Sequence, residues 1–367
     1  MNVVIDKDLE ELNKVFSNNS NYKISILPAN EITNQNIKNS DALFLRSVTR
    51  INNALLENTK VKFIASLTSG EDHIDHELLK EMSIQLSTGK GGNSLAVIEY
   101  TLSVISNLLM GNKIKPFESS IGIIGYGNIG KRLKSILDEI NYPSFVFDPY
   151  QPKNSSSLEK VLACDVISIH CSYSKKGKYP SHQLLDKNIF AQLKDNQFLI
   201  NTSRGEVLSD EFYFAKNKDN FVFDVWPNEN EVDFTKLQKP YLATPHIAGK
   251  TIGAENNFTE KALKDFNVYF DKKLRTLDLF EKINFIVDKS IEKEIDFFGI
   301  APSLFLKIYD VKRDDLIFQK FFGTKQSNFS FQNLRTSLKR PGFNSHKLVG
   351  NLSFKTKSKL ELIGFRL

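Results

Sequence analysis

The chain has 367 residues, with 49 Lys and Arg against 43 Asp and Glu, and 41% of its residues are hydrophobic. Because a single hydrophobic core seldom grows beyond about 250–300 residues, this length predicts two or three domains. The composition is typical of a globular protein and excludes collagen-like, disordered and coiled-coil chains. No apolar run reaches the ~18–20 residues of a membrane span, and the first residues do not resemble a signal peptide. With only two cysteines, Cys164 and Cys171, the sequence predicts a cytoplasmic protein without a disulfide framework and without a membrane partner.

The first 95 residues alternate between short apolar runs and charged, periodic segments. Residues 2–5, 42–46 and 63–66 are predicted strands, and residues 7–16 a helix. This alternation indicates a parallel sheet with helical crossovers. A long helix is predicted over residues 94–110.

A second set of strands follows that helix. They are predicted at residues 120–125, 144–147, 166–169, 198–201 and 221–223. A second long helix is predicted from about residue 254 to residue 274. Two long helices that bracket a nucleotide-type sheet indicate one domain inserted into another. The predicted parts are residues 1–95 with a return at 271–280, residues 96–270, and residues 281–367.

The composition shifts after residue 280. Residues 281–367 hold 16 basic and 9 acidic side chains, whereas residues 1–280 hold 33 and 34, so the last 87 residues carry the whole positive excess. Helices are predicted at 303–309 and 312–322, and short alternating segments at 347–354 and 359–365, with a solvated turn near 355–359. The excess charge could serve a subunit interface, a phosphorylated substrate or a solvated face; no motif that reads a nucleic-acid groove accompanies it, so no nucleic-acid partner is expected.

The residues most specific for a function are three glycines in the segment SIGIIGYGNIG, residues 120–130. Gly125, Gly127 and Gly130 follow a predicted strand and open a helix, where they would permit a tight turn, approach to a pyrophosphate, and close helix–strand packing. Asp148 ends the next strand, 18 residues beyond Gly130, which suits a ribose diol. Because its charge would repel a 2′-phosphate, the pattern favours NAD over NADP. The alternative is a glycine-rich turn in an unrelated α/β protein.

Three further residues follow predicted strands. Arg204 lies in NTSRG (201–205), Glu229 in DVWPNENE (224–231) and His246 in ATPHIAG (243–249). An arginine can bind a carboxylate, a histidine can accept a hydroxyl proton, and a carboxylate can orient that histidine. Each residue alone could be structural: a surface ion pair, a solvated acid or a packed histidine.

These motifs resemble the D-isomer-specific 2-hydroxyacid dehydrogenase family. LRSVTRIN (45–52), TSGEDHID (68–75), GGNSLAVIEY (91–100) and YDVKRDD (309–315) further resemble the narrower family of erythronate-4-phosphate dehydrogenases. The resemblance implies an α/β fold, with a Rossmann-type NAD domain inserted in a flavodoxin-like substrate domain and a small α+β C-terminal domain for homodimerisation. It also implies NAD-dependent oxidation of 4-phospho-D-erythronate in the synthesis of pyridoxal 5′-phosphate.

The resemblance assigns roles to individual residues. Arg204, Glu229 and His246 match the catalytic positions. The positions expected to contact the cofactor are Gly125, Gly127, Asn128, Ile129, Gly130, Asp148, Cys171, Thr202, Ser203, Arg204, Asp224 and Gly249. Ser47, Thr68 and Lys250 match substrate-contacting positions, although the relatives have tyrosine in place of Lys250.

Several alternatives stay open from the sequence. The chain could be another 2-hydroxyacid dehydrogenase, of phosphoglycerate or glyoxylate type, or an NADH-sensing regulatory protein on the same fold. Lys339 and Arg340 are expected to face solvent, or to reach a partner's substrate phosphate. His73 and His76 are spaced like metal ligands, but no third ligand is placed nearby, so no metal is expected, and Asp75 is expected to cap a helix instead.

Overall fold

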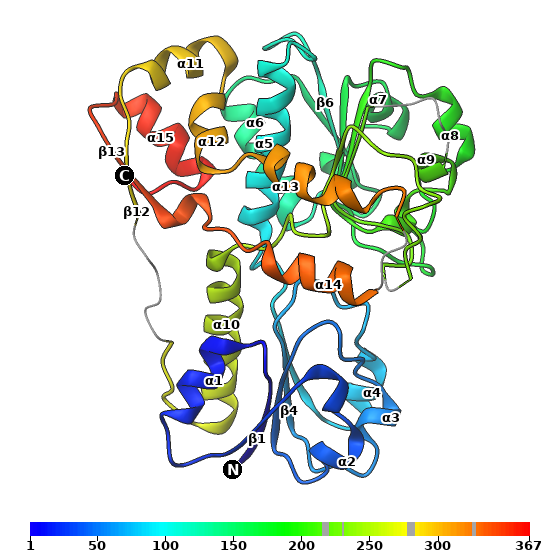
Figure 1. The fold of residues 1–367 in the computed structure, drawn as a ribbon, viewed down its shortest axis with the longest axis vertical. Helices are drawn as coiled ribbons and strands as arrows, with labels where there is room; N and C mark the ends of the chain where they lie inside the picture. Colours follow the sequence, from blue (N-terminus) through cyan, green and yellow to red (C-terminus); the bar gives the residue numbers. More distant parts are fainter. Residues whose placement is uncertain (215–219, 230, 277–282, 325–327) are drawn as a thin grey trace. The chain divides into compact units, whose positions relative to one another are not determined.

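The structure, a computed structural model, describes residues 1–214, 220–229, 231–276, 283–324 and 328–367 (Figure 1). Its contacts divide the chain into two units, Met1–Asn93 with Ile252–Glu281 and Ser94–Thr251 with Lys282–Leu367. This division differs from the three parts that the sequence predicts. Helix α10 (Ile252–Phe270) groups with the first unit because it packs on strands of that unit, and the C-terminal segment groups with the nucleotide-type sheet.

The first unit is built around a five-stranded parallel sheet in the order β2-β1-β3-β4-β5, which is the flavodoxin-like order. Besides α10, its elements are β1 (Asn2–Asp6), α1 (Glu10–Ser17), β2 (Lys23–Leu27), α2 (Asn34–Ile37), β3 (Ala42–Leu45), α3 (Asn53–Leu56), β4 (Phe63–Ser66), α4 (His76–Glu81) and β5 (Gln85–Thr88). The predicted cap is confirmed, because the Asp75 carboxylate accepts from the Leu78 N–H of α4. Strands β2 and β5 were not predicted, since edge strands expose polar side chains and lack the continuous apolar run of a buried strand.

The second unit contains a six-stranded parallel sheet in the order β11-β10-β9-β8-β6-β7. Its elements before residue 252 are α5 (Ser94–Met110), β6 (Ile121–Ile124), α6 (Asn128–Glu139), β7 (Ser144–Phe147), α7 (Leu158–Leu162), β8 (Val166–Ile169), α8 (Lys187–Gln192), β9 (Phe198–Asn201), α9 (Glu211–Phe214), β10 (Phe221–Phe223) and β11 (Leu242–Ala243). All predicted strands of this set are confirmed, and the two-residue β11 is the one that the sequence did not reveal.

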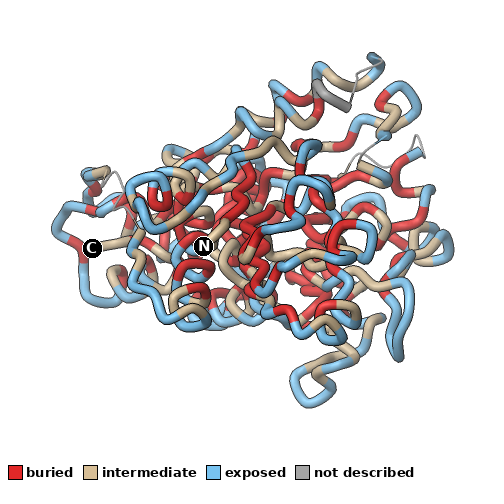
Figure 2. Tube along the Cα trace, turned by 90° about the horizontal axis from the view of Figure 1, so that it is seen from below, coloured by how far each residue is buried: buried red, intermediate tan, exposed pale blue. Residues whose placement is uncertain are grey.

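Alternate strand residues of this sheet enter two separate cores. Phe221 and Phe223 pack with the residues around α8 and α9, whereas Val222 between them packs with α5 and α6. Figure 1 shows α5 and α6 on one side of the sheet and α7, α8 and α9 on the other. The inner strands are buried, as β3, β4, β6, β8 and β9 show, and Figure 2 shows buried segments in the interior and exposed segments mostly on peripheral loops.

The C-terminal segment, residues 283–367, adds mixed structure to the second unit. It comprises β12 (Ile283–Ile286), α11 (Ser290–Phe298), α12 (Pro302–Ile308), α13 (Val311–Phe318), α14 (Asn328–Ser337), β13 (His346–Val349) and α15 (Phe354–Ile363), with β12 and β13 paired in parallel. The predicted turn near 355–359 and the alternating segment 359–365 are wrong, because residues 354–363 form helix α15. Helices α11 and α14 were also not predicted.

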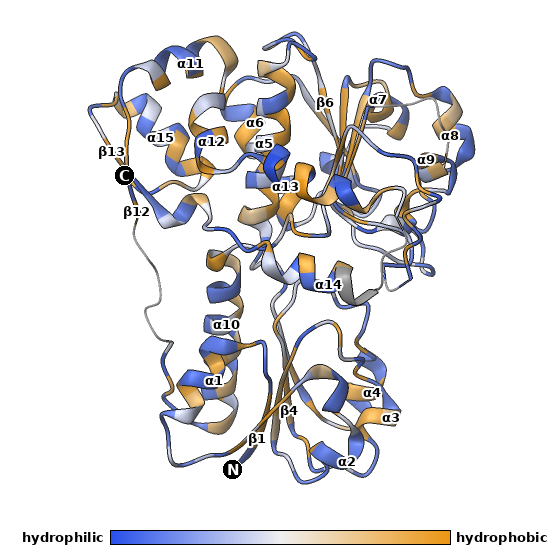
Figure 3. Ribbon diagram, in the orientation of Figure 1, coloured by the Kyte–Doolittle hydropathy of each residue, from blue (hydrophilic) through white to orange (hydrophobic). Residues whose placement is uncertain are grey.

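The C-terminal segment shares a hydrophobic core with α5 and α6. Ile291, Leu304, Phe343 and Leu360 belong to the same buried cluster as the inner face of the NAD-type sheet. Figure 3 shows hydrophobic residues concentrated on α5, on α12 and on the strands near β6. The segment therefore completes the cover on one face of this sheet. Among the described residues, no helix is both long enough and apolar enough to span a bilayer.

Helix α5 is buried on nearly all sides, so its polar side chains require partners within the protein. Ser103 Oγ donates to the Tyr309 carbonyl at 2.9 Å and accepts from the Val311 N–H at 3.0 Å. Asn107 donates to the Asp310 carboxylate at 3.0 Å. These bonds fix the start of α13 on α5.

Glu99 of α5 and Arg340 form a buried ion pair. Arg340 Nη1 lies 2.8 Å from Glu99 Oε2, and the other carboxylate oxygen accepts from the Phe343 N–H at 2.7 Å. The guanidinium also lies 3.8 Å from the centre of the Tyr309 ring. Arg340 is thus buried inside its own chain, so the expectation that it faces solvent or a partner's substrate is wrong.

We predict that Arg340→Met destabilises the second unit strongly. Removing one partner leaves the Glu99 carboxylate buried without its cation, which costs about 3–5 kcal/mol of unfolding free energy. Urea denaturation measures this loss, with Arg313→Met as a control because Arg313 is an exposed arginine of the same segment. The double variant Glu99→Leu/Arg340→Met should recover part of the loss. Equal denaturation midpoints for Arg340→Met and the control would contradict a stabilising role for the pair.

Candidate active site

The glycine-rich loop lies where the order of the sheet strands reverses. The chain passes from β6 to β7 on one side and later returns to β8 on the other side of β6, which is the position where open α/β sheets bind ligands. Gly125 has a φ of +99°, and a Cβ there would lie 2.5 Å from the Cys171 nitrogen. A Cβ on Gly130 would lie 1.9 Å from the Gly125 carbonyl oxygen. Both positions therefore require glycine.

The next glycine leaves space for a ligand. Gly127 is the N-cap residue of α6, and a Cβ on it would have no atom within 4 Å. Asn128 and Ile129 form the first turn of that helix, whose N–H groups favour an anion. The loop thus has an open side next to the helix N-terminus, which fits the pyrophosphate of a dinucleotide.

Asp148 follows β7 and points back to this loop. Its carboxylate accepts from the Tyr126 N–H at 2.7 Å and from the Tyr150 N–H at 2.9 Å. Each carboxylate oxygen has a second lone pair, so these two bonds leave acceptor capacity for the hydroxyls of a ribose.

The loops after β8 and β9 meet through buried hydrogen bonds. Ser203 Oγ donates to the Cys171 carbonyl, and Thr202 Oγ lies 3.1 Å from His170 Nδ1. Burial lowers the pKa of His170 to about 3 and raises the pKa of the Cys171 thiol to about 11. Both side chains are neutral at physiological pH, so they serve as packing and hydrogen-bonding groups. Cys171 faces Gly125 across the strand reversal.

Arg204 lies directly after β9, where the backbone is fixed on both sides. Asn201 donates from its amide to the Arg204 carbonyl at 3.0 Å, and Arg204 Nη1 donates to the Ser203 carbonyl at 2.9 Å. A Cβ on the next residue, Gly205, would lie 2.2 Å from the carbonyl carbon of Trp226. The loops after β9 and β10 therefore pack in direct backbone contact.

Glu229 and His246 form a hydrogen-bonded pair between the loops after β10 and β11. Glu229 Oε2 lies 2.7 Å from His246 Nδ1. Burial acts to raise the pKa of Glu229, but the charge of His246, its hydrogen bond and Arg335 together lower that pKa below its usual value. Because an ionised carboxylate only accepts, Nδ1 carries the proton and Nε2 of the neutral ring keeps the free lone pair. This arrangement can accept a proton from a substrate hydroxyl.

Asp224 holds the loop that carries His246. Its carboxylate is buried and accepts from the Ile247 N–H at 2.7 Å, the Ala248 N–H at 2.9 Å and the Thr244 hydroxyl at 2.7 Å. Burial raises the pKa of Asp224, although the nearby His246 and these donors act in the opposite direction. The Asp224 carboxylate thus fixes the conformation of the loop that carries His246. Gly249 follows on the same loop, and a cofactor contact of either residue stays a prediction.

Two cationic side chains link this loop to α14. Lys250 Nζ donates to the Arg335 carbonyl at 3.0 Å. Arg335 Nε donates to the His246 carbonyl at 3.1 Å, and its Nη1 lies 4.0 Å from Glu229 Oε2. Arg335 belongs to α14 and was not predicted as a site residue, since no motif surrounds it in the sequence; only the basic excess of the C-terminal segment hinted at such a role.

The predicted substrate residues divide between the units. Ser47 follows β3 and is exposed, and Thr68 follows the adjacent β4, so both lie at the carboxyl edge of the first sheet. Lys250 lies in the second unit, as do Arg204, Glu229 and His246. His73, which was considered as a metal ligand, lies with Nε2 2.9 Å from the Ser66 hydroxyl.

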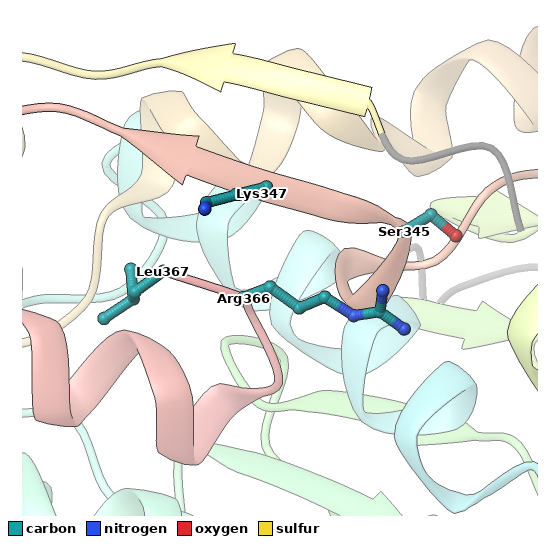
Figure 4. A pocket seen from close by; sticks show the side chains of 4 residues that line it. All are labelled: Ser345, Lys347, Arg366 and Leu367. Atoms are coloured by element: carbon teal, nitrogen blue, oxygen red, sulfur yellow. The ribbon is translucent and has the colours of Figure 1, made fainter.

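A shallow cavity of about 260 Å³ lies elsewhere in the second unit. It is lined by Ser345, Lys347, Arg366 and Leu367, beside β13 (Figure 4). None of these residues belongs to the predicted site, and no buried polar side chain converges on the cavity apart from Ser345. The candidate active site is therefore assigned from the strand ends and not from this cavity.

Comparisons with known proteins identify the family. Residues 107–248 match the family model described as D-isomer specific 2-hydroxyacid dehydrogenase, NAD binding domain. An erythronate-4-phosphate dehydrogenase of Hahella chejuensis is 33% identical over 329 residues, which cover 86% of this chain and 84% of the relative. One of Serratia proteamaculans is 30% identical over 340 residues, with 88% and 89% covered.

Solved structures support the same fold. The D-lactate dehydrogenase from Aquifex aeolicus complexed with NAD and lactic acid has a TM-score of 0.59 at 20% identity, covering 74% of this chain and 96% of that chain. The NAD-dependent formate dehydrogenase from Staphylococcus aureus in complex with NAD has a TM-score of 0.60 at 18% identity, covering 76% and 99%. The predicted α/β fold is confirmed.

We predict that Asp148→Asn narrows the preference for NAD over NADP. The amide cannot accept both ribose hydroxyls and does not repel a 2′-phosphate, and a lost charged hydrogen bond costs about 1.5–3 kcal/mol. The ratio of kcat/KM for the two cofactors measures this change. Glu139→Gln is the control, since it removes an exposed carboxylate at the far end of α6. An unchanged ratio would refute the ribose contact.

Proposed function

The chain belongs to the D-isomer-specific 2-hydroxyacid dehydrogenase family and, within it, to the erythronate-4-phosphate dehydrogenases, and on this premise we propose that it oxidises 4-phospho-D-erythronate with NAD. The products are 2-oxo-3-hydroxy-4-phosphobutanoate, NADH and a proton. The chain is thus an oxidoreductase of pyridoxal 5′-phosphate synthesis. A phosphoglycerate-type dehydrogenase and an NADH-sensing regulator are not favoured, because relatives matched over more than four fifths of the chain are erythronate-4-phosphate dehydrogenases.

The observation that carries the proposal is the 2.7 Å contact between Glu229 and His246 at the carboxyl edge of the NAD-type sheet. In the direction of oxidation, His246 Nε2 accepts the proton of the C2 hydroxyl while the C2 hydrogen leaves as hydride. Glu229 stabilises the imidazolium that forms and keeps the ring oriented. Bound NAD supplies the hydride acceptor.

Arg204 is proposed to hold the substrate carboxylate. A guanidinium matches a carboxylate through two parallel hydrogen bonds, and it can also polarise the neighbouring oxygen at C2. Arg204 lies at the end of β9, next to β10, whose following loop carries Glu229. His246 follows β11, on the far side of β10, so the proposed anchor, the orienting carboxylate and the proposed base follow three consecutive strands of the sheet.

The other predicted contacts fit the same function. For NAD we propose Gly125, Gly127, Asn128, Ile129, Gly130, Asp148, Cys171, Thr202, Ser203, Arg204, Asp224 and Gly249. The open position at Gly127 and the strand-end carboxylate of Asp148 support the first part of this set. Ser47, Thr68 and Lys250 are proposed for the substrate on the family resemblance. Lys250 is half-buried, and the positive charge of its ammonium group would attract the substrate phosphate.

We predict that His246→Ala lowers kcat by roughly 10²–10⁴, the usual range for a general base. Glu229→Gln keeps the size of the side chain but removes the charge that stabilises the imidazolium. The inflection of the pH–rate profile for oxidation should therefore move to lower pH. The measurement is NADH formation from 4-phospho-D-erythronate between pH 5 and pH 10.

The control for this pair is Glu206→Gln, which removes a nearby carboxylate that contacts the Asn228 N–H and not the histidine. If the Glu229→Gln profile overlays that of the wild type, the proposed pairing is wrong. A wild type that reduces NAD with 3-phosphoglycerate or lactate and not with 4-phospho-D-erythronate would overturn the substrate.

We further propose that the chain forms a homodimer through its C-terminal segment, in the cytoplasm. Ile286 and Val349 lie opposite each other in the β12–β13 pair and are 84% and 44% exposed. Phe354, at the start of α15, is 88% exposed. Apolar side chains gathered in this way favour a self-complementary contact about a twofold axis. The two thiols, both free, are compatible with a reducing compartment.

Ile286→Glu/Val349→Glu should shift the protein from dimer to monomer, because the contact would then bury two like charges against their copies. Light scattering coupled to size exclusion measures the mass. Val268→Glu is the control, since Val268 is a 78% exposed residue of α10 in the first unit. If Ile286→Glu/Val349→Glu is still a dimer, this surface is not the dimer interface. Deleting the segment is a poorer test, because its buried residues complete the core on α5.

A further inference from the structure

We propose that Arg335 is a positioning residue of the active site, which holds the His246–Glu229 pair in its reactive arrangement. The inference rests on the proposed function of that pair. It assigns to the C-terminal segment a role in catalysis within its own chain, separate from any role in dimerisation.

Arg335 contacts both members of the pair. Its Nε donates to the main-chain carbonyl of His246 at 3.1 Å, and its Nη1 lies 4.0 Å from Glu229 Oε2. The side chains of Arg335 and Glu229 are 21% and 19% exposed, so the charges are only partly screened by water. One guanidinium thus bridges the backbone that carries the histidine and the carboxylate that orients it.

The backbone at His246 needs such support. Its φ is +57°, a left-handed conformation that a residue with a Cβ seldom adopts and that persists only when its surroundings fix it. On one side, the His246 N–H donates to the Asp224 carbonyl at 2.6 Å, and the next two N–H groups donate to the Asp224 carboxylate. On the other side, Arg335 binds the His246 carbonyl. The peptide after His246 is therefore held at both its ends.

Arg335 itself is held firmly. Phe331, one turn earlier in α14, is buried and stacks on Phe234 with ring centres 5.9 Å apart. At the other end, Lys250 Nζ donates to the Arg335 carbonyl at 3.0 Å. Lys250 belongs to the loop that carries His246, so the loop and the helix bind each other twice.

The charged groups around the His246–Glu229 pair indicate which electrostatic effect Arg335 has. Asp224 and Glu229 are the acids that face His246, whereas Arg335 and Lys250 are the bases beside its loop. The cation of Arg335 helps to keep the pKa of Glu229 below its usual value. Its removal should therefore weaken the ionised state of the carboxylate that orients His246.

Two variants of Arg335 and one matched control test its two contacts. Arg335→Gln removes the charge but keeps an N–H donor for the His246 carbonyl, Arg335→Lys keeps the charge, and Arg313→Gln is the matched control at an exposed arginine of α13. For each, we would measure kcat and KM with 4-phospho-D-erythronate across pH, the melting temperature, and the titration of the His246 ring by NMR. The ring signal is assigned by its loss in His246→Ala.

Arg335→Gln should lower kcat by roughly 10–100-fold, the range expected when a reacting group is slightly misplaced, with KM for the substrate within about twofold of wild type. The inflections of the pH–rate profile and of the His246 titration should differ from those of the wild type, because the cation beside Glu229 is lost. Arg335→Lys should restore the inflections. Arg313→Gln should match the wild type in every measurement.

Unchanged kcat and unchanged inflections in Arg335→Gln would overturn the proposal, as would a rise in KM at constant kcat, which would make Arg335 a substrate ligand. A lower kcat with an unmoved His246 titration and a lowered melting temperature would reduce Arg335 to a structural role and would also overturn it. The NMR titration needs no substrate. It therefore still decides the role of Arg335 if the wild type fails to oxidise 4-phospho-D-erythronate, an outcome that would refute the proposed function alone.

Discussion

The buried carboxylate of Glu99 is the constraint on which the second unit depends. A charge with no exposure needs several donors, and Glu99 obtains them from Arg340 and from the Phe343 N–H. Arg340 in turn donates to the Ala96 carbonyl at 3.1 Å and to the Ala248 carbonyl at 3.4 Å. One ion pair therefore ties together the long helix α5, the C-terminal segment and the loop that carries His246.

The C-terminal segment is consequently part of the second unit and shares its core. It covers one face of the sheet, where Leu304 and Leu360 join the core of α5 and α6. It also lies against the loop after β11, through Arg340 and through α14. The proposed contact between two copies at β12 and β13 would act on this same segment and would therefore connect dimerisation with the geometry of the proposed site.

The sequence predicted the parts of this protein that depend on local patterns. The glycine loop and the caps are set by residues a few positions apart, and the inner strands by continuous apolar runs, as at 42–45 and 63–66. Edge strands and α15 were missed or misassigned because their polar residues give no clear period. The environments of Arg335 and Arg340 could not be predicted, since their partners at Glu229 and Glu99 are more than 100 residues away in the chain.

The active-site loop shows why long-range contacts matter for the chemistry. Local backbone preferences do not favour a histidine at positive φ, so contacts from other segments must fix the conformation of His246. Asp224, which follows β10, accepts hydrogen bonds from the N–H groups of this loop with both carboxylate oxygens, although burial disfavours its charge. Tyr100 of α5 adds a 2.7 Å bond to the Thr244 hydroxyl on the same loop. The strand ends determine which residues meet, and these buried polar contacts determine the angle at which His246 meets Glu229.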